Sequence, residues 1–362
     1  MHYYNAINKD NYASINIDKK TIRRIIVSCA VECKGSIEDI QAHLENIFDI
    51  HISEGSISNI LTEAAEKAKA FNDSISLDRI KIGVSDEIFQ AGIPVLVGVE
   101  PLSTYVYLMN PSEKRDSAAW WMAYSEKQEN QGLNIEESIT DGGLGMKKGI
   151  KETYENISEQ YDIFHMLMKF TKAENIYENK VYGLINAEYK CEKKFLKAKP
   201  KVTQEEYEKA CAKSSIAIEK YDILKILIMW IHELLNFGTY SYEDRAELIN
   251  FILEELSHIQ INSSYLDEAI KTLSSNKESL LYFVKKAEKL FLELSIEEGI
   301  SLDTLNLFWQ QYGISSSKNK YWILDSKLKS SLGNNYCRIK AKAAEILKTI
   351  VRCSSIVENI NS

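Results

Sequence analysis

Two aspartates in the first half of the chain, Asp86 and Asp141, have surroundings that could support metal chemistry. Each ends a short apolar stretch, and Asp141 is followed at once by Gly142 and Gly143. Neighbouring carboxylates repel each other unless a divalent cation lies between them, and Mg²⁺ prefers carboxylates, waters and phosphate oxygens. Two such ions about 4 Å apart can activate an attacking oxygen and stabilise a leaving one. The acids therefore predict a site for two Mg²⁺ or Mn²⁺ ions, beside glycines that let a phosphate approach.

Each acid, taken alone, also has a simpler explanation. Asp before Gly is common in turns, so the D-G-G segment by itself is weak evidence for a metal site. Asp86 could cap a strand, and Glu87 beside it is a competing ligand. The metal interpretation therefore depends on the fold bringing both acids together.

The elements expected to position these acids form an RNase H-like mixed sheet. Residues 78–110 contain three short β-rich stretches, which favour an antiparallel meander. A helix, a strand ending at Asp141, a second helix and a short strand within 159–170 follow. The predicted order is βββαβαβ. In such a sheet the first and fourth strands are neighbours, so Asp86, predicted at the end of the first, can converge with Asp141.

Residues 17–72 predict three helices ahead of this sheet. Ser36 and Ser53 are candidate N-caps of the second and third helices, an order typical of a helix-turn-helix module. The polar residues near the start of the third helix, expected to face phosphates or base edges, are Ser53, Ser56, Ser58 and Asn59. Residues 1–75 carry eight basic and eleven acidic side chains. A three-helix packing or dimerisation unit is therefore the alternative.

The remainder of the chain is predicted to be helical, with a basic C-terminal part. Helical periodicity extends from Thr171 to about Lys318, and a long hairpin is expected around the Lys199-Pro200-Lys201 junction. The net charge of the whole chain is −8, but nine basic and two acidic residues lie between Lys318 and Arg352. This part could line an electropositive groove or form a solvated helix face.

Composition excludes several classes of protein. The six cysteines are scattered without a CxxC pair, which favours reduced thiols and a cytoplasmic location over a zinc knuckle. The most apolar stretch contains Lys225 and His232, so no membrane span is expected. No signal peptide is visible at the N-terminus. We expect a predominantly helical α+β protein of two or three units.

Several segments resemble a bacterial insertion-sequence transposase of the DDE type, over nearly the whole chain. They are SDEIF, PVLVGVEPLS, TDGGLGMKKG, QYDIFH and RCSSIVENINS. Such enzymes have an RNase H-like catalytic domain. Their Mutator-like and hAT-like members share a [C/D]-x-x-H element and a helical insertion before the third acid. The resemblance implies a helix-turn-helix DNA-binding region at 1–75, a catalytic core beginning at 76–170, an all-helical insertion at 171–330 and a catalytic helix at 331–362.

Glu358 is the third metal ligand that the resemblance implies, with Glu345 as its rival. The residues expected to share its helical face are Val351, Ser354 and Ser355. Relatives continue beyond the N-S with a basic helical extension, whereas this sequence stops at Ser362. We therefore expect a chain truncated at its C-terminus, in which a fraying helix end holds Glu358 weakly and lowers or abolishes activity.

The resemblance also implies auxiliary residues and partners. Asp162 and His165 match the D-x-x-H element, and His165 could contact a phosphate, orient a carboxylate or pack in the core. The expected contacts to the DNA backbone are Arg338, Lys340, Lys342, Lys348 and Arg352. The implied partner is double-stranded DNA, at element ends and target, with the chain acting as a homo-oligomer. Alternatives to cleavage and strand transfer are a catalytically inactive DNA-binding protein and a nuclease that cuts without joining.

Overall fold

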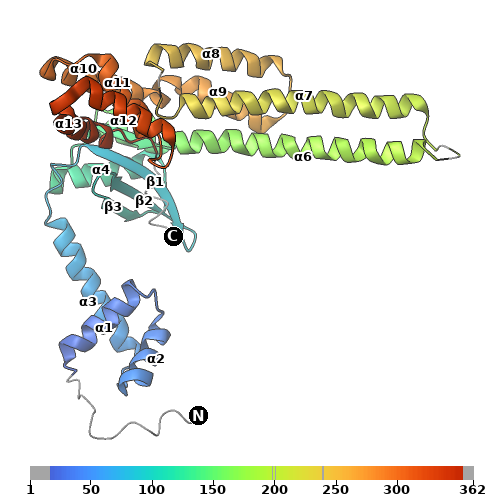
Figure 1. The fold of residues 1–362 in the computed structure, drawn as a ribbon. Helices are drawn as coiled ribbons and strands as arrows, with labels where there is room; N and C mark the ends of the chain where they lie inside the picture. Colours follow the sequence, from blue (N-terminus) through green and yellow to red (C-terminus); the bar gives the residue numbers. More distant parts are fainter. Residues whose placement is uncertain (1–16, 198, 200, 239, 354–362) are drawn as a thin grey trace, which may run out of the picture. The chain divides into compact units, whose positions relative to one another are not determined.

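The structure is a computed structural model that describes residues 17–197, 199, 201–238 and 240–353 (Figure 1). The chain divides into two compact units, Met1–Ser76 and Leu77–Ser362. The three regions expected at 76–170, 171–330 and 331–362 therefore fall almost entirely within the second unit. The protein is α+β and predominantly helical, as predicted, with one mixed five-stranded sheet.

The first unit consists of the three expected helices. They are α1 (Lys19–Val31), α2 (Ile37–Phe48) and α3 (Glu54–Asp73). Ser36 and Asp39 form a reciprocal capping box at the start of α2, and the Ser53 hydroxyl caps α3 by accepting from the Ser56 N–H. Between α2 and α3, Asp49 adopts a left-handed conformation with φ of 53°. A small apolar core made by Ile26, Ile40, Leu44 and Ile57 holds the helices together.

The sheet in the second unit has the strand order β3-β2-β1-β4-β5. Its strands are β1 (Ile82–Gln90), β2 (Ile93–Glu100), β3 (Tyr105–Pro111), β4 (Glu137–Thr140) and β5 (Ser158–Tyr161). The first three pair antiparallel, whereas β4 pairs parallel to β1 and β5 parallel to β4. The order βββαβαβ and the neighbouring first and fourth strands are therefore confirmed. Helices α4 (Ser117–Gln131) and α5 (Leu144–Thr153) provide the crossovers that parallel pairing requires.

The two faces of β1 have different coverings. Because side chains alternate along a strand, Ser85 points to one face while Val84 and Asp86 point to the other. The Ser85 hydroxyl is 2.5 Å from that of the buried Tyr124 of α4. On the opposite face Val84 belongs to an apolar cluster of β1, β2 and β4 residues, against which Val351 packs. The chain near residue 351 therefore lies on the face that carries Asp86.

The helical part of the second unit begins earlier than expected. It contains α6 (Ile163–Phe195), α7 (Gln204–Leu234), α8 (Tyr242–His258), α9 (Ser264–Leu280), α10 (Tyr282–Glu298), α11 (Leu302–Tyr312), α12 (Asn319–Leu332), the short 3₁₀ helix η3 (Gly333–Asn335) and α13 (Tyr336–Lys348). The expected long hairpin is formed by α6 and α7, which lie side by side and extend well beyond the other helices (Figure 1). We call this hairpin the arm. Because α6 starts at Ile163, the arm is continuous with the sheet.

The C-terminal part departs from the predicted helix. Helix α13 ends at Lys348, so Val351 lies after the helix and not on a helical face. The Gln160 side chain donates to the Val351 carbonyl at 2.9 Å, and the Ile163 N–H donates to the Arg352 carbonyl at 3.1 Å. Tertiary contacts to the β5–α6 junction therefore replace the helix here. Ser354, Ser355 and Glu358 lie outside the described residues.

Within the residues that the structure describes, no helix combines the length and apolarity needed to cross a bilayer.

Candidate functional site

Asp86 and Asp141 are brought near each other by β1 and its parallel neighbour β4. The last printed pair of the parallel β1–β4 ladder is Val84 with Ile139, so the same register continued by two residues brings Asp86 opposite Asp141. Asp141 directly follows β4. Asp86, however, is the fifth residue of nine in β1 and not at its end, because the pairing with β2 continues to Gln90. The predicted convergence depends on the short β4, which leaves this edge of β1 open beyond Val84.

Asp86 is a largely buried acid in a negatively charged setting. Its side chain is 17% exposed, and its Oδ1 accepts from the Glu87 N–H at 2.8 Å. Burial raises its pKa to about 6. The Glu87 N–H and the nearby His165 oppose this rise in pKa, whereas Asp141 and Asp162 add to it. A divalent cation would relieve this crowding of carboxylates, so the donors fit a hard, oxygen-seeking ion.

The D-G-G segment has a specific geometry after β4. The Gly143 N–H donates to Asp141 Oδ1 at 2.8 Å, which leaves the carboxylate further acceptor positions for a ligand. Gly142 has φ of +88°, and a Cβ at this position would overlap the ring of Tyr161 in β5. Glycine is therefore required at position 142 because the ring of Tyr161 lies there. The reason expected from the sequence is a different one, the approach of a phosphate.

The D-x-x-H element forms the first turn of α6. Asp162 is fully buried and caps the helix, because its Oδ1 accepts from the N–H groups of Phe164 at 2.7 Å and His165 at 3.3 Å. Its own N–H donates to the Thr140 carbonyl, which fixes the start of α6 to the end of β4. The cap also directs His165 towards the site, where its Nε2 is 4.0 Å from Asp86 Oδ2. Within the described residues this buried Nε2 has no hydrogen-bond partner.

Asp141 and His165 thus both lie near Asp86. Among the described residues, no three His, Cys, Asp or Glu side chains are grouped so that they could hold a metal ion. Glu358 lies outside them. The described chain nevertheless ends close to the acids, because the Arg352 carbonyl accepts from the Ile163 N–H, next to Asp162.

Most of the expected C-terminal DNA contacts have partners within the protein. Arg338 forms an ion pair with Glu298, and Lys342 with both Glu297 and Glu298. The other basic residues expected there are Lys340, which pairs with the buried Asp325, Lys348, which is exposed, and Arg352, whose guanidinium lies 4.1 Å from the centre of the Phe237 ring. These pairings neutralise much of the positive charge that the sequence suggests, so the expected DNA contacts remain predictions.

In the first unit, the expected contacts lie at the exposed start of α3. Ser53 is occupied as the N-cap, and the hydroxyls of Ser53 and Ser56 are 2.9 Å apart. The side chains of Ser58 and Asn59 are exposed, as contact with DNA requires.

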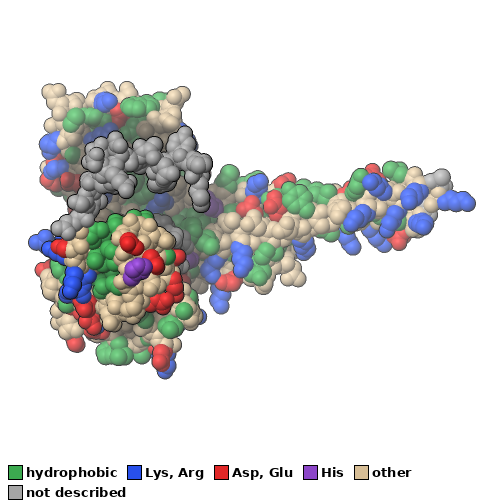
Figure 2. Space-filling view, turned by 90° about the horizontal axis from the view of Figure 1, so that it is seen from below, with side chains coloured by type: hydrophobic (Ala, Val, Ile, Leu, Met, Phe, Trp, Pro, Cys, Tyr) green, Lys and Arg blue, Asp and Glu red, His purple; other side chains and the backbone are tan. Residues whose placement is uncertain are grey.

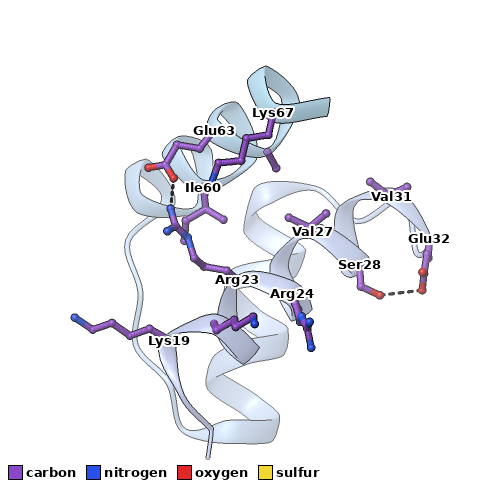
Figure 3. Close-up of a pocket in the computed structure, with 12 residues that line it drawn as sticks. Lys19, Arg23, Arg24, Val27, Ser28, Val31, Glu32, Ile60, Glu63 and Lys67 are labelled. Atoms are coloured by element: carbon purple, nitrogen blue, oxygen red, sulfur yellow. Dashed lines mark hydrogen bonds and ion pairs between the residues drawn. The ribbon is translucent and has the colours of Figure 1, made fainter. Parts of the chain in front are cut away.

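A basic groove between α1 and α3 was not anticipated. It is open, encloses about 760 Å³ and has Val27 and Ile60 among its apolar lining residues (Figure 3). Its basic lining residues are Lys19, Lys20, Arg23, Arg24 and Lys67. Arg23 also reaches Glu63 across the groove. The K-K-x-x-R-R spacing in residues 19–24 could have predicted this groove, because it places four cations three to four residues apart on one helix. The excess of acidic over basic side chains in residues 1–75 concealed it.

In comparisons with known proteins, no protein-family model and no curated protein matches the sequence.

Proposed function

We propose that this chain is a DDE-type DNA transposase, which cleaves DNA at element ends and joins the released ends to a target. The observation that carries the proposal is the position of Asp86 in β1 and of Asp141 directly after β4, the parallel neighbour of β1. Two carboxylates at this point of a β3-β2-β1-β4-β5 sheet are suited to metal-dependent phosphodiester chemistry. The resemblance in the D-G-G and D-x-x-H segments supports the same reading.

Asp86 and Asp141 would hold two Mg²⁺ or Mn²⁺ ions, with Glu358 as the third ligand. When bound, these ions would supply Lewis-acid activation of an attacking oxygen and stabilisation of a leaving one. Water would add to the phosphorus at the element end, and the bond to the leaving oxygen would break to give a 3′-hydroxyl. That hydroxyl would then attack the phosphorus of a target phosphodiester, which forms a new bond from the 3′-oxygen to phosphorus and releases the target strand's own 3′-oxygen as a hydroxyl. No covalent protein intermediate is needed, so the chain requires no nucleophilic side chain.

The neighbouring residues would orient these acids. Asp162 holds the start of α6 against β4, and this cap directs His165 towards Asp86. A protonated His165 would favour the ionised form of Asp86, the form that binds a cation. The Gly143 N–H holds Asp141 in a fixed orientation. These contacts reduce the reorganisation that metal and DNA binding would require.

The course of the C-terminal segment supports Glu358 as the third ligand. Val351 packs on the sheet face that carries Asp86, and the described chain stops at Cys353, five residues before Glu358. At up to about 3.5 Å per residue, the five residues from Cys353 to Glu358 can span at most about 18 Å.

The test is cleavage of element-end DNA with Mg²⁺ or Mn²⁺, comparing wild type with Asp141→Asn and Glu358→Gln. The matched control is Asp222→Asn, which removes the same charge from an exposed position on α7. We expect nicking and strand joining by the wild type and the control, and a loss of at least about a hundredfold in both site variants.

Three other outcomes would count against the proposal in different ways. DNA binding without cleavage, equal in wild type and Asp141→Asn, would favour an inactive DNA-binding protein. Cleavage without joined products would favour a nuclease. Activity that survives Glu358→Gln would show that Glu358 is not the third ligand and would make Glu345 the candidate for that role.

A further inference from the structure

The far end of the arm carries a concentrated positive charge. Residues 190–201 contain six lysines and one acidic residue, Glu192. We call these lysines the lysine tip; they are Lys190, Lys193, Lys194, Lys197, Lys199 and Lys201. Figure 2 shows Lys and Arg side chains gathered towards the far end of the arm. Within a protein of net charge −8, this tip is a local exception.

The lysine tip is available to an external partner. All six side chains are exposed, and none of them pairs with a carboxylate among the described residues. Lysines at the C-terminal end of a helix also stabilise its dipole, which could account for Lys193 and Lys194 in the last turn of α6. That explanation does not extend to Lys199 and Lys201, which lie beyond the helix.

The arm sets a fixed distance between the lysine tip and the acids. Helix α6 is capped by Asp162, which lies near Asp86, and continues without interruption from Ile163 to Phe195. The 29 residues from His165 to Lys194 correspond to about 44 Å at 1.5 Å per residue. The same length of duplex DNA contains about 13 base pairs at 3.4 Å each.

We propose that the lysine tip binds the phosphate backbone of duplex DNA, about 13 base pairs from the phosphodiester at Asp86 and Asp141. The inference rests on the proposed function for the position of the cleaved bond. Lysines act on phosphates as point charges and do not read sequence, so the tip positions the duplex without specifying it.

An anionic membrane is the competing polyanion, and the tip fits it less well. Membrane-surface helices need a wide apolar face beside their cations. The large exposed apolar side chains on this end of α6 are Tyr182, Ile185, Tyr189 and Leu196, and the Lys193 ammonium lies 4.3 Å from the centre of the Tyr189 ring. Four side chains spread over about 21 Å of helix form a narrow stripe and not a wide apolar face.

The test measures DNA binding by the full chain in EDTA, so that metal chemistry does not contribute. The tip variant replaces Lys190, Lys194 and Lys197 by Gln, which has nearly the same helix propensity as Lys. The matched control replaces three exposed lysines elsewhere in the helical part, Lys225, Lys271 and Lys289, and has the same net charge. Affinity for a labelled duplex of about 40 base pairs is measured by fluorescence anisotropy across a range of salt concentrations.

Each neutralised phosphate contributes about 0.9 to the slope of log affinity against log salt. We therefore expect the tip variant to lower this slope by up to about 2.7, and the control to lower it by less than about 1. Wild-type affinity should also rise as the duplex lengthens past about 13 base pairs, and the tip variant should lose that rise. Circular dichroism of the variant should match that of the wild type.

Equal slopes for the tip variant and the control would overturn the inference. So would a tip variant that keeps its DNA affinity but loses binding to phosphatidylserine vesicles. A wild type without DNA affinity would overturn this inference and the proposed function together. Tip-dependent binding without metal-dependent cleavage would leave the DNA contact standing and remove only the proposed chemistry.

Discussion

At the scale of single residues, Asp86 is a carboxyl group whose pKa is raised by burial. Its surroundings favour the protonated acid, since burial and the nearby Asp141 and Asp162 all raise its pKa. The ionised form must therefore be stabilised by another group. His165 does this in part when it is protonated, and a divalent cation would do so more strongly.

This raised pKa makes stability depend on pH in a defined direction. The folded state holds the Asp86 proton up to about pH 6, whereas an ordinary aspartate has a pKa of 3.8. The contribution of the protonated Asp86 to the free energy of unfolding is therefore fully present below about pH 4 and is lost as the pH rises through 6. A shift of this size corresponds to about 3 kcal/mol.

Asp86→Asn should consequently be more stable than wild type at pH 7.5 in EDTA, by about 2–3 kcal/mol, and equal to it near pH 4. Asn keeps an oxygen that can accept from the Glu87 N–H. Urea unfolding at both pH values measures the difference, with Asp222→Asn as the control. Adding Mn²⁺ at pH 7.5 should raise the midpoint of the wild type and leave Asp86→Asn nearly unchanged. A stability difference that is constant with pH would contradict this account of Asp86.

At the scale of elements, the turn after β4 depends on a single glycine. Gly142 combines a positive φ with the ring of Tyr161 where a Cβ would be. Both features must be satisfied for Asp141 to follow β4 in its observed position. A change at Gly142 therefore acts on the site through the backbone and not through lost chemistry.

Gly142→Ala should destabilise the protein by about 1–3 kcal/mol and shift Asp141, with loss of metal binding. The matched control is Gly183→Ala on α6, where a Cβ meets nothing within 4 Å. That substitution should stabilise the helix by about 0.5–1 kcal/mol. Thermal unfolding of both variants and titration with Mn²⁺ provide the measurements. If both variants behaved alike, the steric argument for Gly142 would fail.

Local signals predicted most elements correctly, because caps and periodicity depend on neighbouring residues. Ser36 and Ser53 cap their helices as expected. The strand positions were likewise readable from β-rich runs and turns. The sequence could not reveal where β1 stops, since that depends on pairing with β2. It also could not reveal that Arg338 meets Glu298, a contact across 40 residues.

At the scale of the whole molecule, Arg352 joins distant parts of the second unit. Its Nη1 donates to the Leu235 carbonyl and to Asn236 Oδ1, both at 3.0 Å, and its guanidinium covers Phe237. Its own carbonyl accepts from Ile163. The end of the described chain is therefore fastened both to the base of the arm and to the edge of the sheet. The sequence had suggested Arg352 as a contact to DNA.

Arg352→Met should keep most of the packing on Phe237 but leave the Leu235 carbonyl without this donor. We expect a loss of about 1–3 kcal/mol in the free energy of unfolding, reduced by relief of the repulsion between Arg352 and the buried Arg245. Lys348→Met is the control, because Lys348 is exposed. Urea unfolding of the full chain measures both variants. An unchanged DNA affinity in Arg352→Met would assign Arg352 to structure; weakened DNA binding at full stability would instead restore its predicted role.

Helix α6 also has a mechanical consequence. It starts at the buried Asp162 cap, which is bonded to the end of β4, and extends for 33 residues as one element. Its buried side chains up to Val181 pack in the helical core, and the following 14 residues, about 21 Å, extend past that core to Phe195. A rod that is held over part of its length acts as a lever. A small tilt at its base becomes a large displacement at its free end, and a load on the free end is concentrated at the base. Whatever restrains the arm therefore also steadies His165 against Asp86.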